Sequence, residues 1–118
     1  MNEIAQGATV YVSEVADYEV RREIKRMIQA NQLPVTRLQR LDSLVQFCKQ
    51  LPMTNKMWLR ASDLWAIARN KGVPSAHQAS LDADVLLAAQ ALEVGGTVVT
   101  KNTNHLAPHC PVLCWPQP

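Results

Sequence analysis

The chain has 118 residues, of which 47% are hydrophobic and 19% are charged, and its formal net charge is +2. This balance is typical of one globular domain with its own core. It lacks the strong basicity of dedicated nucleic-acid binders and the run of about 20 apolar residues that a membrane span needs. No basic segment followed by an apolar core opens the sequence, so no secretory signal is expected. Three cysteines, an odd number, favour reduced thiols and a cytoplasmic location.

The first half of the chain predicts two strands separated by two helices. Residues 9–13, Thr-Val-Tyr-Val-Ser, are β-branched or aromatic and predict a strand. Amphipathic helices are predicted over about 15–31 and 36–49, on either side of the helix-breaking Pro34. Residues 51–53, Leu-Pro-Met, predict a very short edge strand, where a proline is tolerated.

A third helix is predicted over about 56–71, and its ends carry clear signals. Thr54 or Asn55 is expected to cap its N-terminus, because both side chains accept hydrogen bonds from free backbone N–H groups. Gly72 is expected to end it. A loop is then predicted over residues 73–79, which include a proline.

The rest of the chain is organised around residues 81–106, LDADVLLAAQALEVGGTVVTKNTNHL. Asp82 and Asp84 are expected to open a helix that is apolar almost all round and ends at the glycine pair 95–96. The β-branched run 97–100 predicts a buried strand. The polar residues that follow lie at the strand's carboxyl end, where open α/β sheets bind ligands.

A last short strand is predicted over 111–115, between prolines and therefore at an edge. The predicted order of elements is β-α-α-β-α-α-β-β. Strands that alternate with helices in this way favour an α/β sandwich with a mainly parallel sheet.

Two segments resemble PIN-domain nucleases. SEVADYEVRREI, at 13–24, resembles the strand-to-helix segment that carries the family's second acidic residue. DADVLLAAQALEVGGTVVTKNTNHL, at 82–106, resembles the block in which an aspartate precedes an aliphatic-Ala-Ala helix and a strand ends in Thr-x-Asn. The resemblance covers about 9–116 and is closest to VapC-type toxins of toxin–antitoxin pairs. It implies a PIN-like three-layer α/β sandwich with a short, mainly parallel sheet, formed as a single domain over residues 1–118.

The resemblance also implies a metal-dependent endoribonuclease. Glu19 matches the second acidic position, Asp84 the third and Asp82 an accessory one, while Thr100 and Asn102 match the Thr-x-Asn that supports the site. Carboxylates of this kind bind Mg²⁺ or Mn²⁺, which activates a water and offsets charge on the scissile phosphate. The implied partners are an RNA substrate, a cognate antitoxin protein and a second copy of the chain in a homodimer, with no membrane.

The chain departs from the family at two positions. The family's first strand, which ends in an aspartate, has no counterpart before Thr9, so the domain is N-terminally incomplete relative to the family. His105 stands where many members have an acidic residue. We expect Glu19 and Asp84 to face each other at the sheet edge, with Asp82 and Asn102 nearby. We also expect strands 9–13 and 97–100 to pair directly within a dimer. The alternatives are a strand donated by a second copy of the chain and a further segment that belongs at this place. The alternative function is a catalytically impaired PIN-like module that binds protein or RNA.

Simpler roles remain open for most of these residues. The aspartate pair 82 and 84 could serve only to start a helix, and Glu19 could be a solvated first-turn carboxylate. The basic residues of helix 15–31 suit a solvated face. Trp58 and Trp65 suit the core or a dimer interface. A cluster of zinc-binding types lacks known zinc spacing, so surface histidines and buried thiols are expected there: His105, His109, Cys110 and Cys114.

Overall fold

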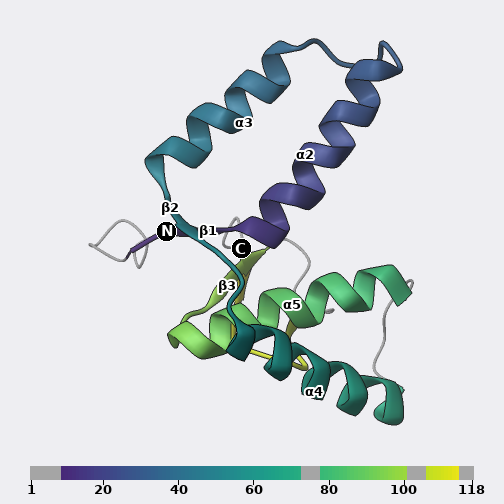
Figure 1. The fold of residues 1–118 in the computed structure, drawn as a ribbon, viewed down its shortest axis with the longest axis vertical. Helices are drawn as coiled ribbons and strands as arrows, with labels where there is room; N and C mark the ends of the chain where they lie inside the picture. The colour runs from purple at the N-terminus through teal and green to yellow at the C-terminus, as the bar shows by residue number, and fades with distance from the viewer. Residues whose placement is uncertain (1–8, 73–77, 101–105, 115–118) are drawn as a thin grey trace. The chain divides into compact units, whose positions relative to one another are not determined.

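The computed structural model describes residues 9–72, 78–100 and 106–114 (Figure 1). Their elements follow the predicted order β-α-α-β-α-α-β-β. The described part of the chain forms two compact units, Asn2–Pro52 and Met53–Pro118, each with two helices and one pair of parallel strands. The elements are β1 (Tyr11–Ser13), α2 (Glu14–Gln29), α3 (Thr36–Phe47), β2 (Lys49–Leu51), α4 (Asn55–Lys71), α5 (Gln78–Val94), β3 (Val98–Thr100) and β4 (Val112–Cys114).

In the first unit, β1 leads directly into α2. Ser13 ends the strand and caps the helix, because its Oγ accepts hydrogen bonds from the backbone N–H groups of Val15 at 3.0 Å and Ala16 at 3.3 Å. β1 pairs in parallel with β2. β2 lies two residues earlier than predicted, at Lys49–Leu51, because α3 already ends at Phe47 and Pro52 has no N–H to donate to a ladder.

The helices α2 and α3 form a hairpin (Figure 1). The turn begins at Asn31, which has a left-handed φ of 58°, and the Gln32 N–H donates to the Met27 carbonyl at 2.8 Å. Arg21 joins the two helices by donating to Asp42 at 2.7 Å. Of the described residues on these helices, Val45 alone is buried, so the hairpin contributes little core of its own.

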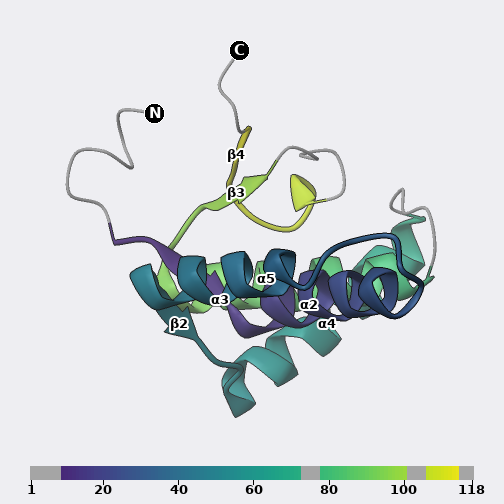
Figure 2. The ribbon, with the colours of Figure 1, turned by 90° about the horizontal axis from the view of Figure 1, so that it is seen from above.

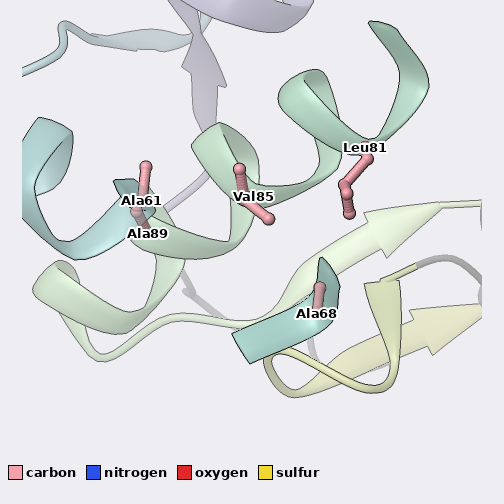
Figure 3. Close-up of a cluster of buried hydrophobic side chains, with 5 residues drawn as sticks. All are labelled: Ala61, Ala68, Leu81, Val85 and Ala89. Carbon is pink, nitrogen blue, oxygen red and sulfur yellow. The ribbon is translucent and has the colours of Figure 1, made fainter. Parts of the chain in front are cut away.

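The second unit holds the larger core, between α4 and α5 (Figure 3). Three alanines meet there, and small side chains allow two helices to approach closely. Leu64 and Trp65 pack at its margin, so Trp65 belongs partly to the core as expected. The buried residues of this cluster are Ala61, Ala68, Leu81, Val85 and Ala89.

The ends of these helices follow the sequence signals closely. Thr54 caps α4, since its Oγ1 accepts from the Met57 N–H at 3.3 Å. Gly72 ends α4 with φ 64°, and Gly95 follows α5 with φ 65°, a conformation that costs glycine no Cβ clash. β3 lies beside β4 (Figure 2), and the two pair in parallel. In their register Thr100 is opposite Cys114.

The start of α5 differs from the prediction. The helix begins at Gln78, so Asp82 and Asp84 do not open it, and the end of the predicted loop 73–79 is helical. Residues 73–77 lie outside the described residues. Leu81 is 4% exposed and packs into the α4–α5 core, so tertiary contact supports a helical turn ahead of the aspartates.

The strand pairing also differs from the prediction. Each described strand has its hydrogen-bonded neighbour within its own unit, β1 with β2 and β3 with β4. The expected direct pairing of 9–13 with 97–100 is therefore not among the described pairs. In each unit a strand later in the chain, β2 or β4, forms hydrogen bonds with the backbone N–H and C=O groups of β1 or β3 that this pairing would have used. None of the described helices has the length and apolar character of a membrane span.

Packing of α5 against α4 predicts a clear difference between two alanines. Ala89 is 0% exposed, so Ala89→Leu should overpack the helix contact and lower the free energy of unfolding by about 1–3 kcal/mol. Ala66 is exposed on α4, so Ala66→Leu should change stability by less than about 0.5 kcal/mol. Urea unfolding followed by circular dichroism measures both. Equal effects would show that the two helices do not meet at Ala89.

Candidate active site

The three candidate carboxylates all lie beyond the first turn of their helices. Glu19 is the sixth residue of α2, where Glu14 and Asp17 occupy the first turn. Asp82 and Asp84 are the fifth and seventh residues of α5. The helix dipole acts mainly within the first turn. The interpretation of these residues as helix-start signals is therefore wrong.

Asp82 and Asp84 lie on opposite sides of α5. Each residue advances about 100° around a helix, so positions two apart lie about 200° apart and do not face each other. Asp82 is exposed, whereas Asp84 is half-buried. One cation therefore cannot be held by both side chains from the same face of the helix, and Asp84 is the better candidate of the two.

Asp84 lies on the face of α5 that meets the turn Leu106–Cys110. Ala88 is one helical turn after Asp84, is 0% exposed, and packs in one cluster with Leu106 and Cys110. The negative charge of Asp84 acts on both His109 and Cys110. Packing of this turn against α5 therefore places Asp84 on the helix face that meets the residues just before β4.

The turn itself presents a histidine that is less exposed than expected. Burial lowers the pKa of the His109 imidazole below its ordinary value, and the charge of Asp84 acts in the opposite direction. His109 Nε2 is buried, and no group in the described part of the chain forms a hydrogen bond with it. His109 is therefore half-buried, with a buried Nε2, where an exposed surface histidine is expected.

The neighbouring cysteine behaves as a buried free thiol, as expected. The Cys110 thiol donates weakly to the Leu106 carbonyl at 3.8 Å. Burial raises the pKa of this thiol, and the nearby charge of Asp84 raises it further. A protonated, buried thiol is a poor metal ligand.

Glu19 has a different environment. Its carboxylate is half-buried and lies 3.8 Å from the Arg22 guanidinium, one helical turn further along α2. Nearby, Arg21 donates to Asp17 and Asp42, and these bonds raise the pKa of the guanidinium above its ordinary value. This part of α2 therefore mixes both signs of charge.

The described residues include only some members of the predicted acidic site. Glu19 and Asp84 belong to different units, and their facing arrangement stays a prediction. Asn102 and His105 lie outside the described residues. Over residues 9–72, 78–100 and 106–114, no three His, Cys, Asp or Glu side chains gather in a group that could hold a metal ion.

His109 is the residue that sequence reasoning missed. In the sequence it counts only as one member of a cluster of zinc-binding types, and it is expected to be a surface histidine. What marks it in the structure is a buried Nε2 without a hydrogen bond, in a turn whose residues Leu106 and Cys110 pack with Ala88, and local sequence does not reveal that contact.

Comparison with known proteins identifies the family. The PIN domain model matches residues 1–107, so the chain belongs to the PIN domain family. The fold is similar to a chain in the crystal structure of VapBC2 from Rickettsia felis bound to a DNA fragment from their promoter. The TM-score is 0.75 and the sequence identity 18%, over 97% of this chain and 80% of that chain. A search of curated proteins gives no match. The predicted PIN-like α/β fold is confirmed.

The lowered pKa of His109 predicts a pH-dependent stability. The ordinary pKa is 6.5, and burial lowers it in the folded chain, so below pH 6.5 the unfolded chain binds the proton more readily. Stability contributed by neutral His109 is therefore present above that pH and is lost as the pH falls toward the lowered pKa. Thermal melts of chelator-treated protein between about pH 7.5 and pH 5.5 measure this loss, and His109→Gln should reduce the slope. An unchanged slope would contradict the burial of this imidazole.

Proposed function

We propose that the chain is a metal-dependent endoribonuclease of the PIN type, similar to VapC toxins. The observation that carries this proposal is the position of Asp84. A half-buried carboxylate beyond the first turn of α5 is not explained by capping, and it lies beside a turn with a buried, unpartnered imidazole nitrogen. A buried imidazole nitrogen without a hydrogen bond costs free energy, so it marks this turn for attention beside the acidic residue.

Asp84 would be the principal metal-holding residue, with Glu19 as the second and Asp82 as an accessory. Carboxylate oxygens fit the preference of Mg²⁺ and Mn²⁺. When bound, the cation supplies positive charge to the scissile phosphate and makes a water more acidic. The chain's own part is to fix the Asp84 charge on a packed helix, while Asn102 would support the site.

The proposed partners follow from the family and from the similar structure. The substrate would be RNA, in the cytoplasm. The similar structure is a VapBC2 complex, which supports a cognate antitoxin protein as a partner for this chain. The family membership and the acidic residues together support these two partners, and we propose no membrane partner.

A homodimer is the proposed assembly. On α4, Trp58 is 53% exposed and Leu59 is 68% exposed, and these large apolar surfaces suit a two-fold contact. Light scattering at micromolar concentration should give twice the mass of the chain. A monomeric mass would remove the dimer from the proposal.

A second candidate function is a PIN-like module that binds protein or RNA without cleaving it. It is favoured by the lack of a three-ligand metal group among the described residues. Fewer carboxylates hold less negative charge against a divalent cation, so metal affinity falls. In this case Asp84 would be a structural residue, and the chain would bind RNA with or without the cation.

Replacement of Asp84 separates the two functions. Asp84→Asn keeps the shape of the side chain and removes its charge, so RNA cleavage should fall by at least about 10-fold, as expected when metal affinity is lost. Cleavage by the unaltered protein should also need Mg²⁺ or Mn²⁺ and stop with a chelator. The assay follows gel-resolved cleavage of a pool of structured and single-stranded RNAs.

Asp63→Asn is the matched control, because Asp63 is exposed on α4 and should leave cleavage unchanged. Chelator-resistant cleavage, or full activity of Asp84→Asn, would contradict the metal mechanism. RNA binding without cleavage at any metal concentration would support the second candidate instead.

A further inference from the structure

An exposed tyrosine and two exposed cations lie on one side of α2. Tyr18, Arg22 and Lys25 are spaced four and three residues apart, so they form one stripe about 10 Å long on the helix. Gln29 continues the stripe at the same spacing. The half-buried Ile24 lies at least about 100° away from each of the three around the helix. The stripe therefore faces away from the apolar side of α2.

The aromatic ring of the stripe is open to solvent. Tyr18 is 60% exposed, although aromatic side chains gain much from burial. The Arg22 guanidinium lies 5.2 Å from the centroid of this ring, from one helical turn further along α2. This cation–π contact holds ring and guanidinium side by side and leaves most of the tyrosine uncovered. An exposed ring with a cation beside it is a surface on which a nucleobase stacks.

The basic side chains of α2 differ in how far carboxylates neutralise them. Arg21 and Arg26 each donate hydrogen bonds to a carboxylate. Arg22 is 3.8 Å from the Glu19 carboxylate, beyond hydrogen-bond distance, and its side chain is 55% exposed. Lys25 is exposed and pairs with no carboxylate of the described residues. The positive charge that α2 leaves available to a partner is therefore concentrated on the stripe.

An open ring followed by two available cations fits a single-stranded nucleic acid. Such a strand offers an unpaired base to the ring and phosphates to the cations. A duplex keeps its bases stacked on one another, so it gives the ring no base to contact. An acidic peptide would satisfy the cations but would leave the ring without a flat partner. The contact between Arg22 and Glu19 also places the stripe beside one of the proposed acidic residues.

We propose that Tyr18, Arg22 and Lys25 bind single-stranded RNA, with one base stacked on Tyr18 and neighbouring phosphates paired with Arg22 and Lys25. This inference rests on the proposed function, because that function supplies RNA as the substrate. It names the residues that hold the strand and does not involve the cation. RNA binding at the stripe therefore persists when cleavage is stopped by a chelator.

RNA binding in the presence of a chelator tests the stacking contact. The full chain is titrated into fluorescein-labelled oligo(A), and separately into the duplex of oligo(A) with oligo(U), and fluorescence anisotropy is measured. Tyr18→Leu should weaken binding of the single strand by at least about 5-fold, the lower end of what loss of one stacked base costs. Tyr18→Phe keeps the ring and should bind as the unaltered chain does. The duplex should bind more weakly, and Tyr18→Leu should not change its affinity.

Salt dependence tests the two phosphate contacts. For single strands, the logarithm of the association constant falls against the logarithm of salt concentration with a slope of about 0.7 per neutralised phosphate. Arg22→Gln and Lys25→Gln should each make this slope shallower by about 0.7. Tyr18→Leu should lower the affinity and leave the slope unchanged. A merely structural role of these side chains would not divide the effects in this way.

Two exposed residues outside the stripe give matched controls. Tyr11 is an exposed tyrosine of β1 with the Lys49 ammonium 5.9 Å from its ring centroid, so Tyr11→Leu removes a similar ring and cation pair. Lys56 is exposed on α4, so Lys56→Gln removes a similar charge. Both variants should bind oligo(A) as the unaltered chain does. Circular dichroism establishes that every variant is folded.

The outcomes separate this inference from the proposed function. Unchanged oligo(A) affinity in folded Tyr18→Leu, or an equal loss in Tyr11→Leu, would overturn the inference and leave a nuclease standing if the chain cleaves RNA. Binding of poly-glutamate instead of oligo(A) would assign the stripe to an acidic protein segment and also overturn it. Tyr18-dependent RNA binding without cleavage in Mg²⁺ or Mn²⁺ would support the inference and overturn the proposed nuclease.

Discussion

The close contact between α4 and α5 is the constraint on which the candidate site depends. Alanines from both helices meet in this core, and Ala89 is fully buried there. A well-packed interior transmits displacement instead of absorbing it, so the orientation of α5 about its axis is fixed. That orientation decides which carboxylate faces solvent and which faces the turn at Leu106–Cys110. Asp82 takes the first position and Asp84 the second.

The same face of α5 connects packing to electrostatics. Ala88 packs with Leu106 and Cys110, and the half-buried His109 belongs to the same turn, within reach of the charge of Asp84. In a region of lower dielectric, a fixed charge acts more strongly than it does in water. The fold thus places a half-buried carboxylate on this face of α5 and leaves His109 Nε2 without a hydrogen-bond partner among the described residues. A molecule selected only for stability would be expected to remove or satisfy such a nitrogen.

Much of this fold could be predicted from the sequence, because its signals are local. Hydrophobic periodicity located the helices, and Thr54, Gly72 and Gly95 marked helix ends that the structure confirms. The start of α5 could not be found in this way. Asp82 and Asp84 imitate a helix start, while the true extension depends on the contact that Leu81 makes with α4.

In the candidate site, too, the features set by local sequence could be predicted, and those set by long-range packing could not. Resemblance to the PIN family identified Asp84, and family membership is shown. The divergence of Asp82 from Asp84 follows from helix geometry once both residues are known to lie inside α5. The burial of His109 was not predictable, because it requires the packing of a turn against a helix about 20 residues earlier in the chain. The predicted strand pairing was wrong for a similar reason. β1 pairs with β2 and β3 pairs with β4, and these long-range contacts cannot be read from local sequence.

The central claim is that the cation site is built around Asp84 on the face of α5 that meets the turn. Paramagnetic broadening in a ¹H–¹⁵N correlation spectrum tests it most directly, because Mn²⁺ broadens the amide signals closest to it. On titration of the ¹⁵N-labelled chain with substoichiometric Mn²⁺, the signals of Asp84 and of residues 106–110 should broaden first. Broadening centred on an exposed aspartate such as Asp63, with the Asp84 and His109 signals unaffected, would contradict the account.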